Sequence, residues 1–570
     1  MVRNKMLTED QFQELKTKPI DLSKYRKLDE TAGLAPYFRM VLGEEMKKWC
    51  KTHTNSNGEN YDLYRDGLKI YTTINPRMQL YGEEAVGKHL SYMQTILNSQ
   101  SNIRKGTVWK GFENVLNTAM KASERWKNLT REGMEEEDIK ATFHQKVPMK
   151  VFAWNDKREM DTIMTPYDSI KYHRQMLQSG FMAMDALTGE VKAWVGGIDF
   201  KTFKFDHVNV NTKRQVGSTI KPLLYGMAIE EGGFTPATPV VDVQQDFGSH
   251  GLVPATSTTC TGRTVSMASA LAWSRNCATA YIMKQLGPEG NEGAKRFVDF
   301  LKNCNLQSKI EPYPSIALGS TEISLFEMMQ AYSMFPGRGF TVKPMFITRI
   351  EDRFGNVLES FMPERKEVIN DVTAYEVTNM MQGVIRSGTG RRMWSYGVQG
   401  EIAGKTGTTN DNSDAWFIGF TPQLIAGIWT GCDDRFVRFS SDVGQGSSVA
   451  LPIWAYFYGK AAADRNTGID TKSQFVKPEN FTPAVLDYEA AQPDEVTEGG
   501  ELEPGEESDY APDPGASDYY IAPESKVPPA DQSQTPGDKK PKDKPKQEEK
   551  QPEQKPKAVL PKKEERSPNF

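Results

Sequence analysis

The stretch Arg214-Gln215-Val216-Gly217-Ser218-Thr219-Ile220-Lys221-Pro222 decides the fold and the chemistry expected of this chain. Apolar residues recur with helical spacing from Ser218 to Glu231, and Gly232-Gly233 then marks a C-terminal stop. Residues three apart share one face of a helix, so Ser218 and Lys221 would stack at its start, where backbone amides favour a developing oxyanion. The pattern favours a serine nucleophile over an ordinary helix-capping serine.

A serine nucleophile needs a base, and the sequence indicates a lysine. The histidines are scattered, and none lies in a strand-turn-helix setting that would aim it at a serine; they are His53, His89, His144, His173, His207 and His250. A lysine acts as a base only as its free amine, which requires a pKa lowered by burial or by a second cation. Lys221 is therefore the predicted base, and Lys405 could be the second cation.

Lys405-Thr406-Gly407-Thr408 has the pattern of an edge strand beside a cleft. Two β-rich runs follow it, at residues 414–420 and 424–429, and they predict a hairpin. Glycine at 407 would let a substrate backbone approach closely, while the cation and the two hydroxyls would recognise a carboxylate. Taken alone, the motif fits an exposed turn lysine with a glycine bulge; beside Ser218-x-x-Lys221 the substrate-binding interpretation is favoured.

Ser274-Arg275-Asn276 lies between two apolar helical stretches, at residues 267–273 and 278–283, which predicts a helix-loop-helix corner. Such a corner could point the Ser274 hydroxyl toward Lys221 as a proton relay and the Asn276 amide toward a substrate amide. The alternative, a helix cap, has equal standing until the other two motifs are counted.

The three motifs in this order resemble the set found in penicillin-binding proteins and class A β-lactamases. Residues 214–222 resemble the lead-in of class A penicillin-binding proteins, with Val216 where proline is usual. Further segments that resemble this family are residues 67–76, 180–197, 317–320 and 388–390. The resemblance runs from near residue 1 to about residue 465.

The resemblance implies roles for these residues. Ser218 would attack the D-Ala-D-Ala bond of a peptidoglycan stem peptide, Lys221 would take its proton, and Ser274 would relay a proton to the leaving D-alanine. Asn276 would hold the donor peptide, and the amides of Ser218 and Thr408 would form the oxyanion hole. The carboxylate-binding residues would be Lys405, Thr406 and Thr408, with Gly407 between them.

The acyl-enzyme would then be resolved by an amine of a neighbouring strand, which forms a cross-link. β-Lactams would bind the same serine, and other cell-wall synthesis proteins are candidate partners. The resemblance implies no cofactor and no metal.

The implied fold is mixed α/β, a penicillin-binding transpeptidase and β-lactamase-like fold with an antiparallel sheet flanked by helices on both faces. We expect this domain at residues 177–465. Residues 1–66 resemble the end of a glycosyltransferase domain with its connector, and residues 67–176 form a linker region with a helical insertion. Residues 475–570, acidic and then rich in Pro and Lys, have too little apolar surface to fold and predict a disordered tail.

Composition bears on partners and location. A net charge of -5 argues against nucleic-acid binding. No apolar run approaches the roughly 18–20 residues that span a bilayer, and no signal peptide is visible. Class A proteins begin with a membrane helix and a glycosyltransferase domain. The expectation is therefore a periplasmic, extracytoplasmic chain that lacks the N-terminal anchor and most of that domain, as a fragment or as a shortened relative.

The five cysteines show no metal-binding spacing, and an odd number leaves at least one thiol free. Cys260 and Cys277 flank the second motif region and could pair in an oxidising compartment, but the sequence does not set their separation.

Three functions are open at this stage: a cross-linking transpeptidase, a hydrolase on the same fold (a D,D-carboxypeptidase or a β-lactamase), and a penicillin-recognising sensor or idle scaffold. Retention of all three motifs disfavours the scaffold, and the class A lead-in and linker disfavour the hydrolase. A serine D,D-transpeptidase is the predicted function. Whether water or an amine resolves the acyl-enzyme depends on the shape of the cleft.

Overall fold

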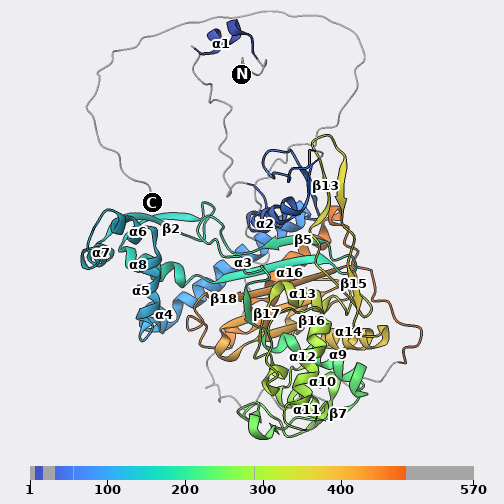
Figure 1. The fold of residues 1–570 in the computed structure, drawn as a ribbon. Helices are drawn as coiled ribbons and strands as arrows, with labels where there is room; N and C mark the ends of the chain where they lie inside the picture. Colours follow the sequence, from blue (N-terminus) through green and yellow to red (C-terminus); the bar gives the residue numbers. More distant parts are fainter. Residues whose placement is uncertain (1–6, 17–32, 56, 288, 483–570) are drawn as a thin grey trace, which may run out of the picture. The chain divides into compact units, whose positions relative to one another are not determined.

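The computed structural model describes residues 7–16, 33–55, 57–287 and 289–482 (Figure 1). The predicted tail from residue 483 onward lies outside the described residues, as do residues 1–6 and 17–32 of the expected glycosyltransferase remnant. Phe475, placed by the sequence at the start of the tail, is instead ordered. Its ring lies 5.6 Å from that of Phe420, and its N–H donates to Glu401 Oε2 at 2.7 Å.

A five-stranded antiparallel sheet forms the centre of the fold, in the order β16-β17-β18-β4-β5. The strands are β4 (Gln178–Asp185), β5 (Val191–Val195), β16 (Ala403–Thr408), β17 (Asp414–Phe420) and β18 (Leu424–Gly431). The predicted hairpin is β17–β18, and it is confirmed. Strands β4 and β5, from the segment 180–197 that resembles the family, form a second antiparallel pair. The motif strand β16 lies at the edge of the sheet, as predicted, and Lys405 pairs with Ile418 of β17.

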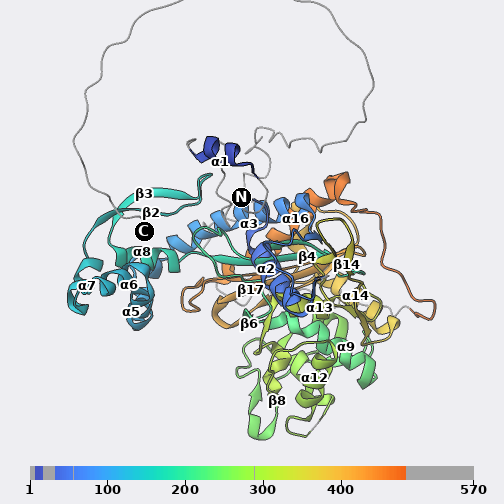
Figure 2. The same ribbon diagram turned by 45° about the horizontal axis from the view of Figure 1, so that its top comes forward.

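Side chains of each strand alternate between two cores, because successive residues of a strand point to opposite faces. On β4, Phe181 and Ala183 pack on one face with the helices α3 (Pro76–Ser99) and α16 (Leu451–Ala463). Met182 and Met184 pack on the other face, with α9 (Lys221–Gly232), α13 (Leu325–Tyr332) and α14 (Asp371–Arg386). Figures 1 and 2 show this helix–sheet–helix layering, with α3 beside α16. The mixed α/β class with helices on both faces is therefore confirmed.

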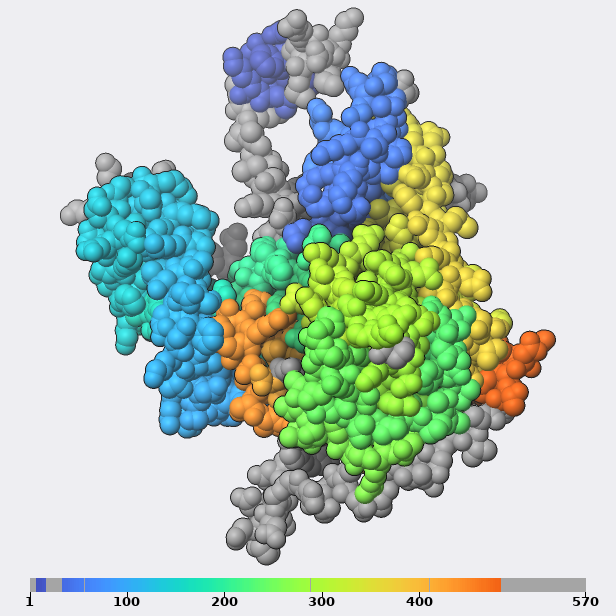
Figure 3. Space-filling view, turned by 60° about the horizontal axis from the view of Figure 1, so that its bottom comes forward, coloured from blue at the N-terminus to red at the C-terminus, as the bar shows by residue number. Residues whose placement is uncertain are grey.

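A mainly helical lobe carries the first two motifs. It begins with the 3₁₀ turn η3 (Gly217–Ile220) and α9, and includes α10 (Met267–Ala272), α11 (Asn276–Gln285), α12 (Glu292–Asn303), η4 (Gly248–His250) and η5 (Pro314–Leu318). Its strands are short and paired in twos: β6 (Lys213–Gln215) with β11 (Glu322–Ser324), β7 (Pro239–Val241) with β10 (Thr264–Ser266), and β8 (Gln245–Asp246) with β9 (Leu252–Val253). Figure 3 shows much of this lobe in green, as one continuous surface.

The remaining elements frame this domain. N-terminal to the sheet lie α1 (Glu9–Lys16), α2 (Pro36–Thr52) and β1 (Lys69–Thr72), and β1 pairs with β13 (Ile347–Glu351), which pairs with β14 (Val357–Ser360). Beyond β11, β12 (Phe340–Val342) pairs with β15 (Arg365–Glu367). Short helical pieces complete the C-terminal half: η6 (Arg391–Tyr396), η7 (Asn410–Asn412), η8 (Asp442–Gly444), α15 (Gly446–Val449) and η9 (Arg465–Thr467).

The sequence places a helical insertion within the linker region 67–176, and residues 101–174 contain most of its short elements. Helices are present: α4 (Ser101–Arg104), η2 (Thr107–Trp109), α5 (Glu113–Ala122), α6 (Glu124–Arg131), α7 (Glu136–Phe143) and α8 (Pro166–Arg174). The region also contains an antiparallel pair, β2 (Val147–Phe152) and β3 (Glu159–Met164), which the helical pattern did not indicate. Among the described helices of the chain, none combines the length and apolar character needed to cross a membrane.

Candidate active site

Ser218 lies in the 3₁₀ turn η3, which leads into α9. The sequence predicted that the α-helix begins at Ser218, whereas α9 begins at Lys221. The preceding Gly217 has a φ of +53°, which favours glycine, and its N–H donates to Gly319 O at 3.0 Å. A Cβ at Gly217 would lie 2.7 Å from Thr408 O. The absence of a side chain at Gly217 thus lets the serine turn pack directly against the backbone of β16.

Lys221 begins α9 and is fully buried. Its Nζ donates to Ser274 O at 2.6 Å and to Asn276 Oδ1 at 2.7 Å, and it lies 3.3 Å from Ser274 Oγ. The corner between α10 and α11, predicted from Ser274-Arg275-Asn276, is therefore present and holds the lysine from two sides. Ser274 occupies the corner with a φ of +59°.

Lys405 reaches the same corner from the sheet. It is also fully buried, and its Nζ donates to Ser274 Oγ at 2.9 Å and to Thr406 O at 3.0 Å. The Ser274 hydroxyl therefore lies between the amino groups of the two lysines. One side chain from each of the three motifs meets at this point.

Burial makes both lysines easier to deprotonate, and repulsion from Lys405 adds to this effect at Lys221. Desolvation lowers the pKa of Lys221 well below its ordinary value of 10.5, and the nearby charge of Lys405 lowers it further, while Asp242 acts in the opposite direction. Burial also lowers the pKa of Lys405, to about 7. These directions match the requirement that a lysine base must hold a free amine.

The remaining residues of the third motif, Thr406, Gly407 and Thr408, follow Lys405 on β16. Thr408 Oγ1 accepts from Gly446 N at 3.0 Å, and Thr406 Oγ1 lies 2.7 Å from Thr389 Oγ1. A Cβ at Gly407 would lie 2.8 Å from Thr219 Cγ2, so this glycine allows β16 to contact the serine turn. The three motifs thus meet, with Lys221, Ser274 and Lys405 joined by hydrogen bonds and the serine turn packed against β16. Among the described residues, however, the half-buried Ser218 has no hydrogen-bond partner for its hydroxyl.

Two residues of the site were not singled out from the sequence. Thr389 follows α14, donates its N–H to Ala272 O at 3.1 Å, and so joins α10 to Thr406 of the sheet. Asp242 follows β7, is fully buried and supports the start of α11. The family resemblance of residues 388–390 was the available signal for Thr389. Asp242 had none, because its partners are 19 to 36 residues away in sequence.

Comparison with known proteins places this geometry in a family. Residues 179–427 match the penicillin binding protein transpeptidase domain, and residues 104–177 match the penicillin-binding protein middle domain. Among relatives, penicillin-binding protein 2D of Bacillus subtilis is 30% identical over 423 residues, covering 72% of this chain and 56% of that protein. Penicillin-binding protein 1A of Aquifex aeolicus is 28% identical, covering 88% of this chain and 66% of that protein.

Solved structures agree in fold. Penicillin-binding protein 1A from Haemophilus influenzae superposes with a TM-score of 0.58 at 18% identity, covering 84% of this chain and 76% of that one. PonA1 from Mycobacterium tuberculosis, solved in complex with penicillin V, has a TM-score of 0.50 at 19% identity, covering 78% of this chain and 96% of that one.

These matches define the class of the chain as a penicillin-binding protein with a transpeptidase domain preceded by a middle domain. It belongs with the class A penicillin-binding proteins, to which it is homologous. The chain spans 56% and 66% of the two curated relatives named above.

Proposed function

We propose that this chain is a serine D,D-transpeptidase that cross-links peptidoglycan stem peptides through an acyl-enzyme on Ser218 and is inhibited by β-lactams. The observation that carries the proposal is the meeting of Lys221, Ser274 and Lys405 beside the serine turn. A transpeptidase domain of this family supports the acyl-transfer class.

Lys221 acts as the base in its neutral form. A neutral amine has two N–H donors and one lone pair, and two acceptors, Ser274 O and Asn276 Oδ1, are in place for the donors. The lone pair is then available for the proton of Ser218. As that proton moves, Ser218 Oγ bonds to the carbonyl carbon of the penultimate D-alanine, and the carbonyl electrons move to its oxygen.

The oxyanion is stabilised by the backbone N–H groups of Ser218 and Thr408. Thr409 N–H pairs with Asp414 O at 3.1 Å across the ladder. Since bonding alternates along an antiparallel strand, the N–H of Thr408 points to the open edge of β16. Each such donor contributes about 3–4 kcal/mol to acyl-transfer catalysis in well-studied cases.

Ser274 and Lys405 complete the transfer. The Ser274 hydroxyl, 3.3 Å from Lys221 Nζ, can pass the proton to the leaving nitrogen of D-alanine when the tetrahedral intermediate collapses. Lys405 and the free O–H of Thr408 bind the terminal carboxylate, because the Thr408 oxygen already accepts from Gly446 N and keeps its own proton to donate. An acceptor amine then attacks the ester and releases Ser218.

We further propose that the chain acts outside the cytoplasm, on peptidoglycan stem peptides, with β-lactams as inhibitors. The disulfide between Cys260 and Cys277 supports this location, because such bonds persist mainly in oxidising compartments.

The test is product analysis with a D-Ala-D-Ala stem pentapeptide, with and without an acceptor amine. A cross-linked product that requires Ser218 is expected. Release of D-alanine with only a tetrapeptide product, even with acceptor present, would identify a carboxypeptidase. No D-alanine release under either condition, with penicillin still bound, would identify a sensor.

A further inference from the structure

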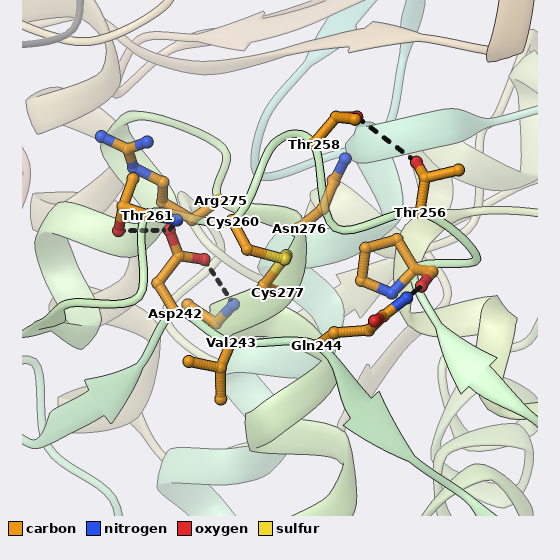
Figure 4. Close-up of a disulfide and its surroundings, with 12 residues drawn as sticks. Asp242, Val243, Gln244, Thr256, Thr258, Cys260, Thr261, Arg275, Asn276 and Cys277 are labelled. Atoms are coloured by element: carbon orange, nitrogen blue, oxygen red, sulfur yellow. Dashed lines mark hydrogen bonds between the residues drawn. A yellow bond between two sulfur atoms is a disulfide. The ribbon is translucent and has the colours of Figure 1, made fainter.

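The first turn of α11 is held by two groups that lie outside the three motifs. Asn276, the first residue of this helix, contacts Lys221, and the next residue, Cys277, forms a disulfide with Cys260. The third residue, Ala278, donates its N–H to Asp242 Oδ1 at 3.0 Å. Figure 4 shows that the disulfide and a hydrogen bond to the Asp242 carboxylate both reach this first turn of α11.

Asp242 supplies a cap that the helix lacks locally. The residue before the helix, Arg275, makes no side-chain cap, although the first N–H groups of any helix need acceptors. A carboxylate is well suited there, because it also complements the positive end of the helix. Its second oxygen accepts from Thr261 N at 3.2 Å and from Thr261 Oγ1 at 2.9 Å. Asp242 therefore ties α11 to the loop that contains Cys260.

The same loop is anchored at its base. Asp242 N donates to Arg263 O at 2.8 Å, and Gly262 N donates to Asp242 O at 3.0 Å, where β7 ends and β10 begins. The loop from residue 255 to residue 262 is otherwise largely exposed. Besides the disulfide, Asp242 links this loop to the start of α11.

We propose that Asp242 and the Cys260–Cys277 disulfide are positioning residues, a brace that holds the first turn of α11 so that Asn276 keeps Lys221 aimed at Ser218. This inference rests on the proposed function for its catalytic part. Displacement of catalytic groups by about 1 Å can cost on the order of 100-fold in rate. A shift of this turn would move Asn276 and therefore Lys221, because Lys221 Nζ donates to Asn276 Oδ1 at 2.7 Å.

Asp242 has a second effect that distinguishes it from the disulfide. Two charged groups act at Lys221: Lys405 on β16 and Asp242 after β7. Tyr225, one turn further along α9, is hydrogen-bonded to Thr279 instead. Lys405 lowers the pKa of Lys221, whereas the Asp242 carboxylate raises it. Arg275, drawn beside Thr261 in the view of Figure 4, is a further charged residue at the start of α11. Removing the charge of Asp242 should make Lys221 lose its proton at lower pH.

The experiment measures acylation by a fluorescent penicillin, across pH, in the 570-residue chain and its variants. Cys260→Ser with Cys277→Ser removes the covalent link without a change in formal charge, and we expect the acylation rate constant to fall about tenfold or more. Asp242→Asn should lower the maximal rate and also move the midpoint of the pH profile to lower pH. Glu292→Gln, an exposed acidic residue in the first turn of α12, is the control and should change neither.

Reduction of the folded wild-type chain gives the same test without a substitution. Acylation should fall in reductant and recover on reoxidation, and the double serine variant should not respond to reductant. Wild-type acylation rates in the reduced protein and in the double variant would overturn the role of the disulfide. An Asp242→Asn variant with an unchanged rate and an unchanged pH midpoint would overturn the role of Asp242.

Hydrogen exchange of the Ala278 amide separates this inference from the proposed function. Exchange should be faster in reduced protein and in Asp242→Asn, whether or not Ser218 is acylated. If wild type fails to acylate but exchange responds as stated, the proposed function fails and the brace stands. If wild type acylates and exchange stays unchanged in both perturbed proteins, the brace is wrong.

Discussion

Lys405 Nζ donates a hydrogen bond of 2.9 Å to Ser274 Oγ, which joins the edge of the sheet to the corner between two helices. In the proposed mechanism, this bond joins the substrate-binding strand to the proton relay. Lys221 lies on the other side of that hydroxyl, at 3.3 Å. The spacing of the two amino groups, both buried, is what lets one lysine influence the protonation of the other.

The Lys221→Arg variant should lose nearly all acylation although the positive charge is kept. Guanidinium remains protonated at any usable pH and cannot accept the proton of Ser218. Acylation rates with one β-lactam, measured for wild type and variant, check this. Near-normal acylation by Lys221→Arg would rule out the lysine base.

The Lys405→Arg variant is the matched comparison and should be milder. In the proposed mechanism the cation at this position binds a carboxylate, which arginine can also bind, so losses should reflect the tight fit of a fully buried side chain. The same acylation assay applies. A loss as complete as that of Lys221→Arg would show that the two lysines are not divided into base and carboxylate ligand.

The pH dependence of acylation has a defined sign. Since the pKa of Lys221 lies well below 10.5, its free amine should predominate well before that pH. Acylation should therefore rise with pH as Lys221 loses its proton and reach its plateau below pH 10.5. Stopped-flow acylation across pH measures the midpoint. A rate that climbs only near the ordinary lysine value would contradict the depressed pKa.

Gly217→Ala should destabilise the protein and abolish acylation. Its φ of +53° costs a non-glycine residue about 1–2 kcal/mol, and its Cβ would lie 2.7 Å from Thr408 O. Gly233→Ala is the control, because φ is +71° there but no atom lies within 4 Å of the new Cβ. Thermal unfolding and acylation of the two variants separate backbone strain from the contact with β16. Equal effects in both would leave that contact without a role.

Thr389→Val should slow acylation while the fold is retained. The change removes the hydroxyl that lies 2.7 Å from Thr406 Oγ1 and leaves that oxygen without this partner, whereas Thr389→Ser keeps it. Activity lost in the valine variant and restored in the serine variant is the expected pattern, measured by acylation beside a circular dichroism spectrum. Equal rates in both variants would contradict a positioning role.

Much of the site could be predicted because its signals are local. The Ser218-x-x-Lys221 spacing, the corner at Ser274 and the edge strand at Lys405 each depend on a few neighbouring residues. The start of α9 was predicted at Ser218 but lies at Lys221. The positive φ of Gly217 and its close contact with Thr408 place Ser218 in a 3₁₀ turn instead.

Other features depend on contacts distant in sequence. Asp242 caps a helix that begins 34 residues later, and no local pattern marks it. The pairing of Cys260 with Cys277 required a Cα–Cα separation of 5.6 Å, which only the folded loop sets. The sequence did not indicate the hairpin β2–β3 for two reasons. Charged helical segments lie on either side of it in the sequence, and most of its strand residues are at least partly exposed, so no clear alternation of apolar and polar residues marks the strands.

The most direct test of the account is covalent labelling by penicillin followed by peptide mapping. The chain should gain the mass of one penicillin, the modified peptide should contain Ser218, and Ser218→Ala should gain none. A penicillin adduct that persists in Ser218→Ala and maps to another residue would contradict the central claim that Ser218 is the acylated nucleophile.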